Sequence, residues 1–294
     1  MAKGAYVGVD GVAHKVKKIY TGVDNVARQV KKGYVGVGGV ARPFFSAEWL
    51  EYYGAIDPLS TSRYYLAATT VGNYALFGGG AGGSPAYKDT VDAYKSNLTR
   101  STPTALSTAR AYLAATTVGN YAVFGGGTGG SPPYKDTVDA YDNTLTRSTP
   151  TVLSIARSYL AATTVGNYAL FGGGRGPSQT NMVDAYDNTL TRSTPTVLSI
   201  NRYSLAATTV GNYALFGGGK GSNPTDGYTV DAYDNTLTRS TPTALRVDSY
   251  YLAATTVGNY ALFGGGRGEA LGYNNTVDAY VDKVGAEIPT FLAI

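Results

Sequence analysis

Short runs of small, β-branched and aromatic residues, each ended by glycine, recur along most of this chain. The stretch LAATTVGNYALFGGG occupies residues 66–80 and returns almost unchanged from Leu113, Leu160, Leu205 and Leu252. Apolar positions within it alternate at the two-residue period of a β-strand. The copies begin 47, 47, 45 and 47 residues apart, and a fixed period of this size is typical of solenoids, propellers and arrays.

Each copy predicts four strands separated by turn-forming residues. In the first copy, strands A to D read LAATTV, NYALFGG, TVDAY and LTRSTPT. Four strands in one such repeat are typical of a β-propeller blade. Strand B carries apolar groups on both faces, as a blade between two neighbours requires. We therefore expect an all-β chain in which residues 46–294 form a five-bladed β-propeller of four-stranded blades.

The strand-D segments outnumber the blades. Besides the four internal copies, residues 48–57 and the C-terminal GAEIPTFLAI could each serve as strand D. A closed ring of five has one such segment in surplus. We expect one terminal segment to close the last blade and the other to link to the N-terminal part, and the sequence leaves open which.

Residues 1–45 carry a different, 14-residue repeat, headed by Tyr6, Tyr20 and Tyr34. A turn dipeptide interrupts each copy and predicts a β-meander or stacked hairpins; these dipeptides are Asp10-Gly11, Asp24-Asn25 and Gly38-Gly39. The whole chain has a net charge of +4, and its basic character belongs to this segment, which holds eight Lys/Arg against two Asp. The lysine pairs Lys17-Lys18 and Lys31-Lys32 are interpreted as solvated turns. A nucleic-acid site would be expected to show a basic stripe along one face or interleaved aromatic residues, which the segment lacks.

The composition offers few groups for catalysis. The chain has no cysteine and one histidine, His14, which rules out thiolate sites, disulfides and cysteine nucleophiles. The run GGGTGG from Gly125 matches a dinucleotide-binding pattern, but prolines follow where that pattern requires a helix. One strand-C position carries five aspartates that should lie apart as polar anchors and not as a catalytic pair: Asp92, Asp139, Asp184, Asp231 and Asp278. We expect no enzyme activity, cofactor or metal.

Neither a signal-peptide core nor an apolar run of membrane-spanning length is visible. We therefore expect a chain that is made in the cytoplasm and does not insert into a membrane. A protein released by cell lysis as part of a particle needs no export signal, so this expectation does not fix where the protein works.

The main repeats resemble the kelch repeat. An arginine precedes strand A (Arg110), strand B ends in a glycine pair (Gly125 and Gly126), and strand C ends in a tyrosine (Tyr141). The resemblance recurs five times over about 85% of the chain and implies a propeller. Kelch repeats usually carry a tryptophan shortly after that tyrosine. In this chain an arginine, or the serine next to it, occupies that place; the arginines are Arg100, Arg147, Arg192 and Arg239. Packing between blades should differ there.

The N-terminal copies resemble segments of structural proteins of phage and prophage tails or virions. They share GV(D/G)(G/N)VA turns and KK steps. This resemblance implies that the chain is displayed on a phage or phage-like particle, with residues 1–45 contacting other particle proteins. The same hairpins could instead join copies of the chain into a homo-oligomer.

The copies differ from one another mainly in the B–C and D–A loops. The A–B turn, VGN, never changes, and the C–D turn is mostly DNTLT. Because the chain reverses at each turn of an antiparallel blade, the two variable loops should emerge on one face. Neutral drift would also have changed the opposite turns. We therefore expect the variable face to bind a host-surface or environmental ligand, either a glycan or a protein.

The candidate ligand-binding residues combine large contact area with polar tips. In the D–A loops they are Arg63, Tyr64, Tyr65, Arg110, Tyr112, Arg157, Arg202, Tyr203, Tyr250 and Tyr251. In the B–C loops they are Tyr87, Tyr134, Arg175, Lys220, Tyr228, Arg267 and Tyr273.

Other functions stay open at this point. A purely structural virion protein would use the propeller as a spacer or decoration, with no soluble ligand. A lectin would carry five similar pockets between blades, whereas a protein receptor would meet one composite face. A glycoside hydrolase or lyase is disfavoured, because no convergent acid pair is visible.

Overall fold

The computed structural model describes residues 54–269 and 272–282, and in the N-terminal part the backbone of 6–9, 12–15, 19–23, 26–30, 32–37 and 40–46. The chain divides into two compact units, Met1–Ala55 and Ile56–Ile294. Strand β6 (Val40–Ser46) lies in the first of these units.

The described strands of the N-terminal unit form three antiparallel pairs, as the hairpin alternative predicts, and no ladder joins one pair to another among these residues. Its strands are β1 (Tyr6–Val9), β2 (Val12–Lys15), β3 (Ile19–Val23), β4 (Val26–Val30), β5 (Lys32–Val37) and β6. Val9 pairs with Val12, Val23 with Val26 and Val37 with Val40, which leaves two residues between the strands of each pair. The expected turn dipeptides lie in these gaps, outside the described residues.

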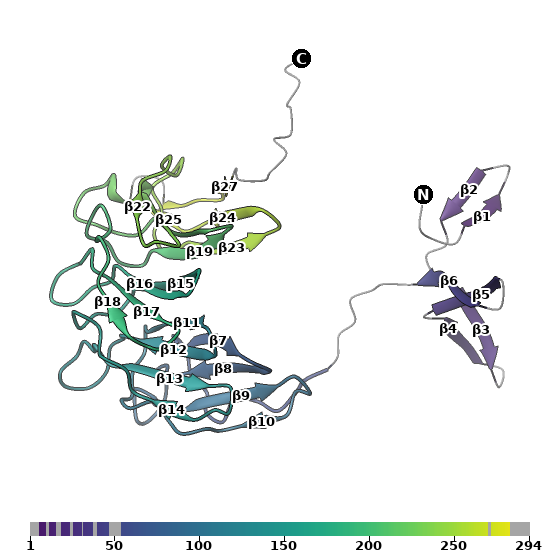
Figure 1. Cartoon of the computed structure of the whole chain (residues 1–294), viewed down its shortest axis with the longest axis horizontal. Coiled ribbons are helices and arrows are strands. Elements are labelled where there is room, and N and C mark those ends of the chain that lie inside the picture. Colours follow the sequence, from purple (N-terminus) through teal and green to yellow (C-terminus); the bar gives the residue numbers. More distant parts are fainter. Residues whose placement is uncertain are drawn as a thin grey trace, which may run out of the picture. The chain divides into compact units, whose positions relative to one another are not determined.

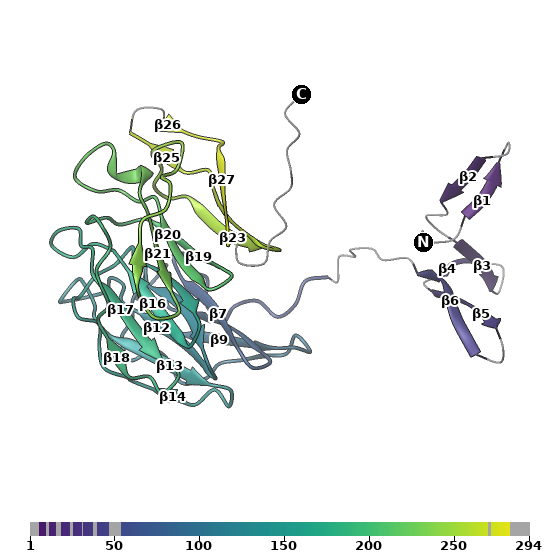
Figure 2. The same ribbon diagram turned by 45° about the horizontal axis from the view of Figure 1, so that its top comes forward.

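The second unit contains four four-stranded antiparallel sheets, each made from one repeat in the order A-B-C-D (Figures 1 and 2). Sheet 1 is β7 (Ala67–Val71), β8 (Tyr74–Gly78), β9 (Val91–Lys95) and β10 (Arg100–Ser101). Sheet 2 is β11 (Ala114–Val118), β12 (Tyr121–Gly125), β13 (Val138–Asp142) and β14 (Arg147–Ser148). Sheet 3 is β15 (Ala161–Val165), β16 (Tyr168–Gly172), β17 (Val183–Asp187) and β18 (Arg192–Ser193). Sheet 4 is β19 (Ala206–Val210), β20 (Tyr213–Gly217), β21 (Val230–Asp234) and β22 (Arg239–Ser240), with a short 3₁₀ turn, η1 (Asp226–Tyr228), between its second and third strands.

Sheet 5 has three described strands: β23 (Ala253–Val257), β24 (Tyr260–Gly264) and β27 (Val277–Val281). A small separate ladder, β25 (Arg267–Gly268) with β26 (Gly272–Tyr273), lies in its B–C loop. The C-terminal strand-D candidate falls outside the described residues.

The segment before the first repeat packs on sheet 1 instead of completing the last sheet. The Tyr94 hydroxyl donates to the Asp57 carbonyl at 2.8 Å, just as the Tyr141 hydroxyl donates to the Thr104 carbonyl of the preceding repeat at 2.7 Å. Residues 57–60 therefore take the place that the end of strand D takes at the other sheets.

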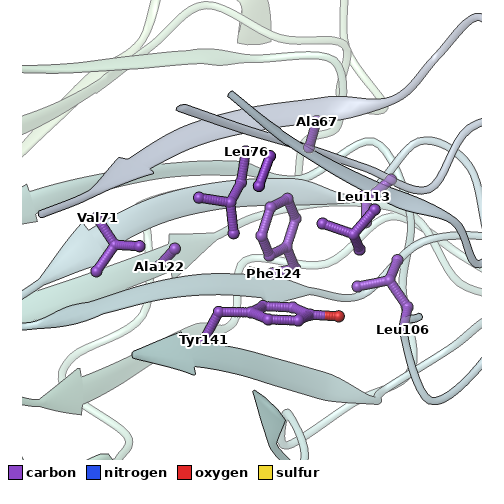
Figure 3. Close-up of a cluster of buried hydrophobic side chains, with 10 residues drawn as sticks. Ala67, Val71, Leu76, Leu106, Leu113, Ala122, Phe124 and Tyr141 are labelled. Atoms are coloured by element: carbon purple, nitrogen blue, oxygen red, sulfur yellow. The ribbon is translucent and has the colours of Figure 1, made fainter. Parts of the chain in front are cut away.

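Successive sheets pack face to face in chain order, with strands A side by side. Gly72, with φ of +52°, opens the A–B turn in the conformation that a two-residue type II′ hairpin requires of its first residue. Between two sheets the side chains form one apolar cluster; between sheets 1 and 2 the Phe124 ring lies among Leu76, Leu113 and Ala122 (Figure 3). Burial of such clusters supplies the main stabilisation of the array.

The two terminal sheets each leave one face uncovered. Strand β23 is exposed at positions that are buried in β11, β15 and β19. Strands β7 and β23 do not pack against each other as neighbouring strands A do. The structure thus contains five sheets built as blades, and it does not show the closed ring.

Candidate ligand-binding face

The D–A and B–C loops lie together along one edge of the sheets, as expected. Tyr64 pairs with Ala81, and Ala81 also pairs with Tyr87, so three segments meet there. Equivalent bridges are Ala111–Thr128–Tyr134, Ser158–Arg175–Gln179, Tyr203–Lys220 and Tyr250–Arg267. At the opposite edge the A–B turn of one sheet lies against the C–D turn of the next, with Gly72 beside Asn143. We call these the loop edge and the turn edge.

The four candidate arginines of the first four D–A loops lie too deep to contact a ligand, which corrects their expected role. Their side chains are 0% exposed, and each pairs with a strand-C carboxylate. The pairs are Arg63–Asp92 at 2.7 Å, Arg110–Asp139 at 2.9 Å, Arg157–Asp184 at 2.8 Å and Arg202–Asp231 at 2.8 Å. Because a buried guanidinium needs a charged partner, these arginines fasten the D–A loops to the sheets.

Each of these carboxylates joins several segments of chain. Asp139 accepts hydrogen bonds from the Ser107 amide at 2.9 Å and the Ser107 hydroxyl at 3.0 Å. It also pairs with Arg147, at 2.9 Å, in the place where a kelch repeat would have tryptophan. An ion pair therefore occupies this position. The aspartates are polar anchors, as the sequence predicted.

Acid should weaken the first of these anchors. Burial of Asp92 opposes ionisation, but hydrogen bonds from Arg63, Arg100 and Ser60 prevail and hold its pKa below the ordinary value. Its stabilising contribution is therefore complete above about pH 4 and is lost as the pH falls through the folded-state pKa. We expect the free energy of unfolding to fall as the pH drops below about 4, by at most ~1.4 kcal/mol per pH unit for this one proton. Urea unfolding of wild type and Asp92→Asn at each pH checks this, since equal slopes for the two proteins would contradict it.

Tyrosines from successive D–A loops stack along the loop edge. The ring centroids of Tyr65 and Tyr112 lie 4.0 Å apart, and those of Tyr112 and Tyr159 lie 4.2 Å apart, with interplanar angles of 29° and 31°. Tyr64 and Tyr203 extend the row at its two ends through edge contacts. We call Tyr65, Tyr112 and Tyr159 the tyrosine ladder. It offers a run of aromatic surface on exposed loops.

The ladder residues adopt a left-handed backbone conformation that residues other than glycine ordinarily avoid. Tyr65, Tyr112 and Tyr159 have φ of 55°, 54° and 55°, and Ser204 and Tyr251 repeat this at the same position. The left-handed region costs about 1–2 kcal/mol for a residue other than glycine. Leucines at positive φ in the C–D turns, such as Leu145, pack against the apolar clusters. Tyr65 has no such burial, being 51% exposed, and strain of this kind gathers at functional sites.

The hydroxyls of Tyr112 and Tyr159 are uncharged at neutral pH. Burial raises the pKa of Tyr112, and hydrogen bonding with Tyr159 and Tyr65 raises it further. Burial also raises the pKa of Tyr159. A ligand at the ladder therefore meets neutral aromatic rings and hydroxyls that can both donate and accept.

Cationic side chains from the B–C loops border the ladder and its continuation. The Arg175 guanidinium lies 5.4 Å from the ring centroid of Tyr203, and the Lys220 ammonium lies 5.4 Å from that of Tyr250. Arg267 lies 6.0 Å from the Tyr273 ring. These contacts, within the range of cation–π attraction, hold positive charge beside aromatic rings.

The remaining candidates differ in how far they are accessible. Tyr64, Tyr251, Tyr273, Arg175 and Arg267 are exposed, whereas Tyr250 is buried. The half-buried ones are Tyr87, Tyr134, Tyr203, Lys220 and Tyr228. Sequence reasoning missed Tyr159, although it precedes Leu160 just as Tyr112 precedes Leu113. Alignment of the repeats at that leucine would have found it.

None of the protein-family models matches the chain, and no curated protein is significantly similar to it. Within the described residues, no group of three or more histidine, cysteine or acidic side chains is arranged to hold a metal ion. The same residues include no helix with the length and apolar character needed to span a membrane.

Proposed function

We propose that this chain is a non-enzymatic recognition protein of a phage or phage-like particle, which binds a host-surface or environmental glycan or protein through the loop edge. The observation that carries the proposal is the tyrosine ladder. Stacked, partly exposed aromatic rings in a strained backbone conformation are costly to keep unless a ligand uses them.

The chemistry of the loop edge suits a ligand with both apolar faces and polar groups. Sugar rings present such faces, and tyrosine-rich surfaces also bind proteins well. Equivalent loops from several repeats place similar contacts side by side, so weak contacts would act together through multivalency.

In the same proposal, the five sheets are kelch-like blades, and the basic hairpins of the N-terminal unit attach the chain to other particle proteins. Location on the particle rests on the resemblance of those hairpins to phage structural proteins. Nucleic acid and membrane insertion have no part in this function.

Replacement of the ladder by serine is expected to abolish ligand binding without unfolding the protein. Ser204 occupies the equivalent position in the fourth repeat, so the backbone accepts serine there. The combined variant Tyr65→Ser, Tyr112→Ser and Tyr159→Ser removes three rings. At about 1 kcal/mol per aromatic contact, affinity should fall ~100-fold or more. The measurement is binding of the full chain to a panel of bacterial surfaces and glycans.

The matched control changes exposed residues of the turn edge, Asn120→Ala with Asn167→Ala, and should bind as wild type does. Unchanged binding by the serine variant would remove the ladder from the site. A wild-type chain that binds nothing across a broad panel would instead favour a structural role. That alternative, a spacer or decoration of the particle, is favoured by the uncovered faces of sheets 1 and 5.

A further inference from the structure

The contact between neighbouring sheets is built in the same way four times. In each, a phenylalanine of one sheet lies against the glycine that ends strand B of the preceding sheet. A Cβ added to Gly78 would lie 2.8 Å from the Phe124 ring. The other pairs are Gly125 with Phe171, Gly172 with Phe216 and Gly217 with Phe263.

Threonine hydroxyls continue from sheet to sheet along strands A. The Thr69 hydroxyl lies 2.9 Å from the Thr117 hydroxyl, which in turn donates to the Thr70 carbonyl at 2.5 Å. The next contacts repeat this arrangement through the pairs Thr116–Thr164, Thr163–Thr209 and Thr208–Thr256.

Backbone hydrogen bonds complete each contact. The Gly80 amide donates to the Arg110 carbonyl of the next sheet at 2.8 Å, and the Tyr112 amide donates back to the Tyr65 carbonyl at 3.0 Å. The first bond recurs as Gly127–Arg157, Gly174–Arg202 and Gly219–Ser249, and the second as Tyr159–Tyr112, Ser204–Tyr159 and Tyr251–Ser204.

Sheet 5 is the last sheet in this series, and among the described residues the groups that would contact a following sheet have no such sheet beside them. No phenylalanine is among the nearest neighbours of Gly264; the atoms nearest to a Cβ added there would belong to Val277 and Thr276 of its own sheet. The Thr255 hydroxyl, the Gly266 amide and the Tyr251 carbonyl have no partner in the described part of the chain. Around them lie exposed apolar side chains that are 36–58% accessible: Val257, Tyr260, Val277 and Val281.

Sheet 1 carries the groups that each later sheet uses to contact the sheet before it. Phe77 is half-buried, whereas the four equivalent phenylalanines are buried. The Thr70 hydroxyl, the Tyr65 amide and the Arg63 carbonyl have no partner among the residues that the structure describes. The Asp92 carboxylate, by contrast, already accepts hydrogen bonds from Arg63, Arg100 and Ser60. Sheet 1 therefore lacks only the sheet that would precede it.

We propose that sheet 1 of a second copy of this chain docks on the exposed face of sheet 5. Phe77 of the incoming copy would lie on Gly264, and its Thr70 hydroxyl would join Thr255, which continues every element of the four internal contacts. Exposed apolar faces of this kind mark interaction sites. The contact is heterologous, joining different faces of two identical chains, so it builds either a ring of copies or an open filament.

A second copy fits better than sheet 1 of the same chain. With four equivalent contacts, sheets 1 and 5 stay uncovered, so closing the ring within one chain would require the contacts between sheets to change their geometry. Docking of another copy leaves them as they are. This inference goes beyond ligand binding at the loop edge and does not depend on it.

Cysteine cross-linking tests the proposal in the full chain. The wild type contains no cysteine, and equivalent threonine hydroxyls lie 2.8–2.9 Å apart, which suits a disulfide between cysteines at these positions. Under mild oxidation, Thr70→Cys mixed with Thr255→Cys should shift to a dimer that reduction reverses. Either variant alone should form no more cross-linked dimer than Thr144→Cys, a control variant with its cysteine in an exposed turn. A chain carrying both cysteines should form a series of multimers.

Two outcomes would overturn the proposal. A disulfide formed within single chains of the double variant would mean that the ring closes on itself. Cross-linking no greater than in the Thr144→Cys control would mean that another partner, or none, covers sheet 5. Sedimentation gives an independent reading: wild type should associate with rising concentration, and Val257→Arg should shift it to monomer without altering its unfolding transition. Wild type that stays monomeric would equally contradict the proposal.

Discussion

Replacing Asp184 with asparagine is expected to lower the free energy of unfolding by about 3–5 kcal/mol, because it leaves a buried arginine without its counter-charge. Asp184 pairs with Arg157 at 2.8 Å and with Arg192 at 2.7 Å, and it accepts two hydrogen bonds from Ser154 at 3.0 Å. Its side chain and that of Arg157 are fully buried. Chemical denaturation of the full chain measures the loss.

The matched control is Asp187→Asn in the same repeat. Asp187 accepts hydrogen bonds from Thr189 and Thr191 in a C–D turn, where water can replace them, so the loss should be about 1 kcal/mol or less. Adding Arg157→Gln to Asp184→Asn should recover part of the stability, since the unpaired charge is then gone. A loss below about 1 kcal/mol for Asp184→Asn would show that the carboxylate does not hold the D–A loop.

Truncation of Phe171 to alanine should cost about 3–5 kcal/mol of stability, as is usual for a fully buried phenylalanine. Its ring lies on Gly125 of the preceding sheet and meets Tyr186 of its own sheet edge to face, with centroids 5.9 Å apart. The change therefore opens a cavity between sheets 2 and 3. Denaturation is measured at concentrations where the protein is monomeric.

Phe77→Ala provides the control for that prediction. Phe77 keeps the same edge contact with Tyr94, at 5.8 Å, but has no preceding sheet in its own chain. Its loss should be roughly half as large, in proportion to the apolar area that it buries. Equal losses at the two positions would mean that the contact between sheets contributes little.

The sequence predicted most of the strands because their periodicity and glycine ends are local features. Strands A, B and C begin and end within two residues of the expected positions, as for β7 (expected 66–71, found Ala67–Val71). Strand D shortens to two residues, such as Arg100–Ser101, because the chain then crosses to the next sheet. The common edge of the variable loops followed from the alternation of chain direction alone.

The depth of the arginines was not predictable from residue type. Arginine is usually exposed unless it is paired, and Arg110 pairs with Asp139, 29 residues further along the chain. Residue type alone predicts anchors at the aspartates and ligand contacts at the arginines. The signal that joins the two sets is a nearly constant spacing, which is 29 residues for Arg63–Asp92 and Arg202–Asp231 and 27 for Arg157–Asp184.

Whether the sheets close into a ring could not be predicted from the sequence either. The angle between two sheets depends on how closely side chains such as Phe124 approach the glycine opposite, and a small difference at one contact is repeated at all four. The repeat number predicts five sheets, but only packing decides whether the fifth returns to the first.

Hydroxyl-radical footprinting can test whether the proposed ligand binds at the tyrosine ladder. The full chain is oxidised free and while bound to the surface or glycan that retains it, and each tyrosine is read by mass spectrometry. We expect Tyr65, Tyr112 and Tyr159 to be protected on binding, while Tyr74, at the turn edge, reacts as before. Protection at the turn edge with an unprotected ladder would contradict the account.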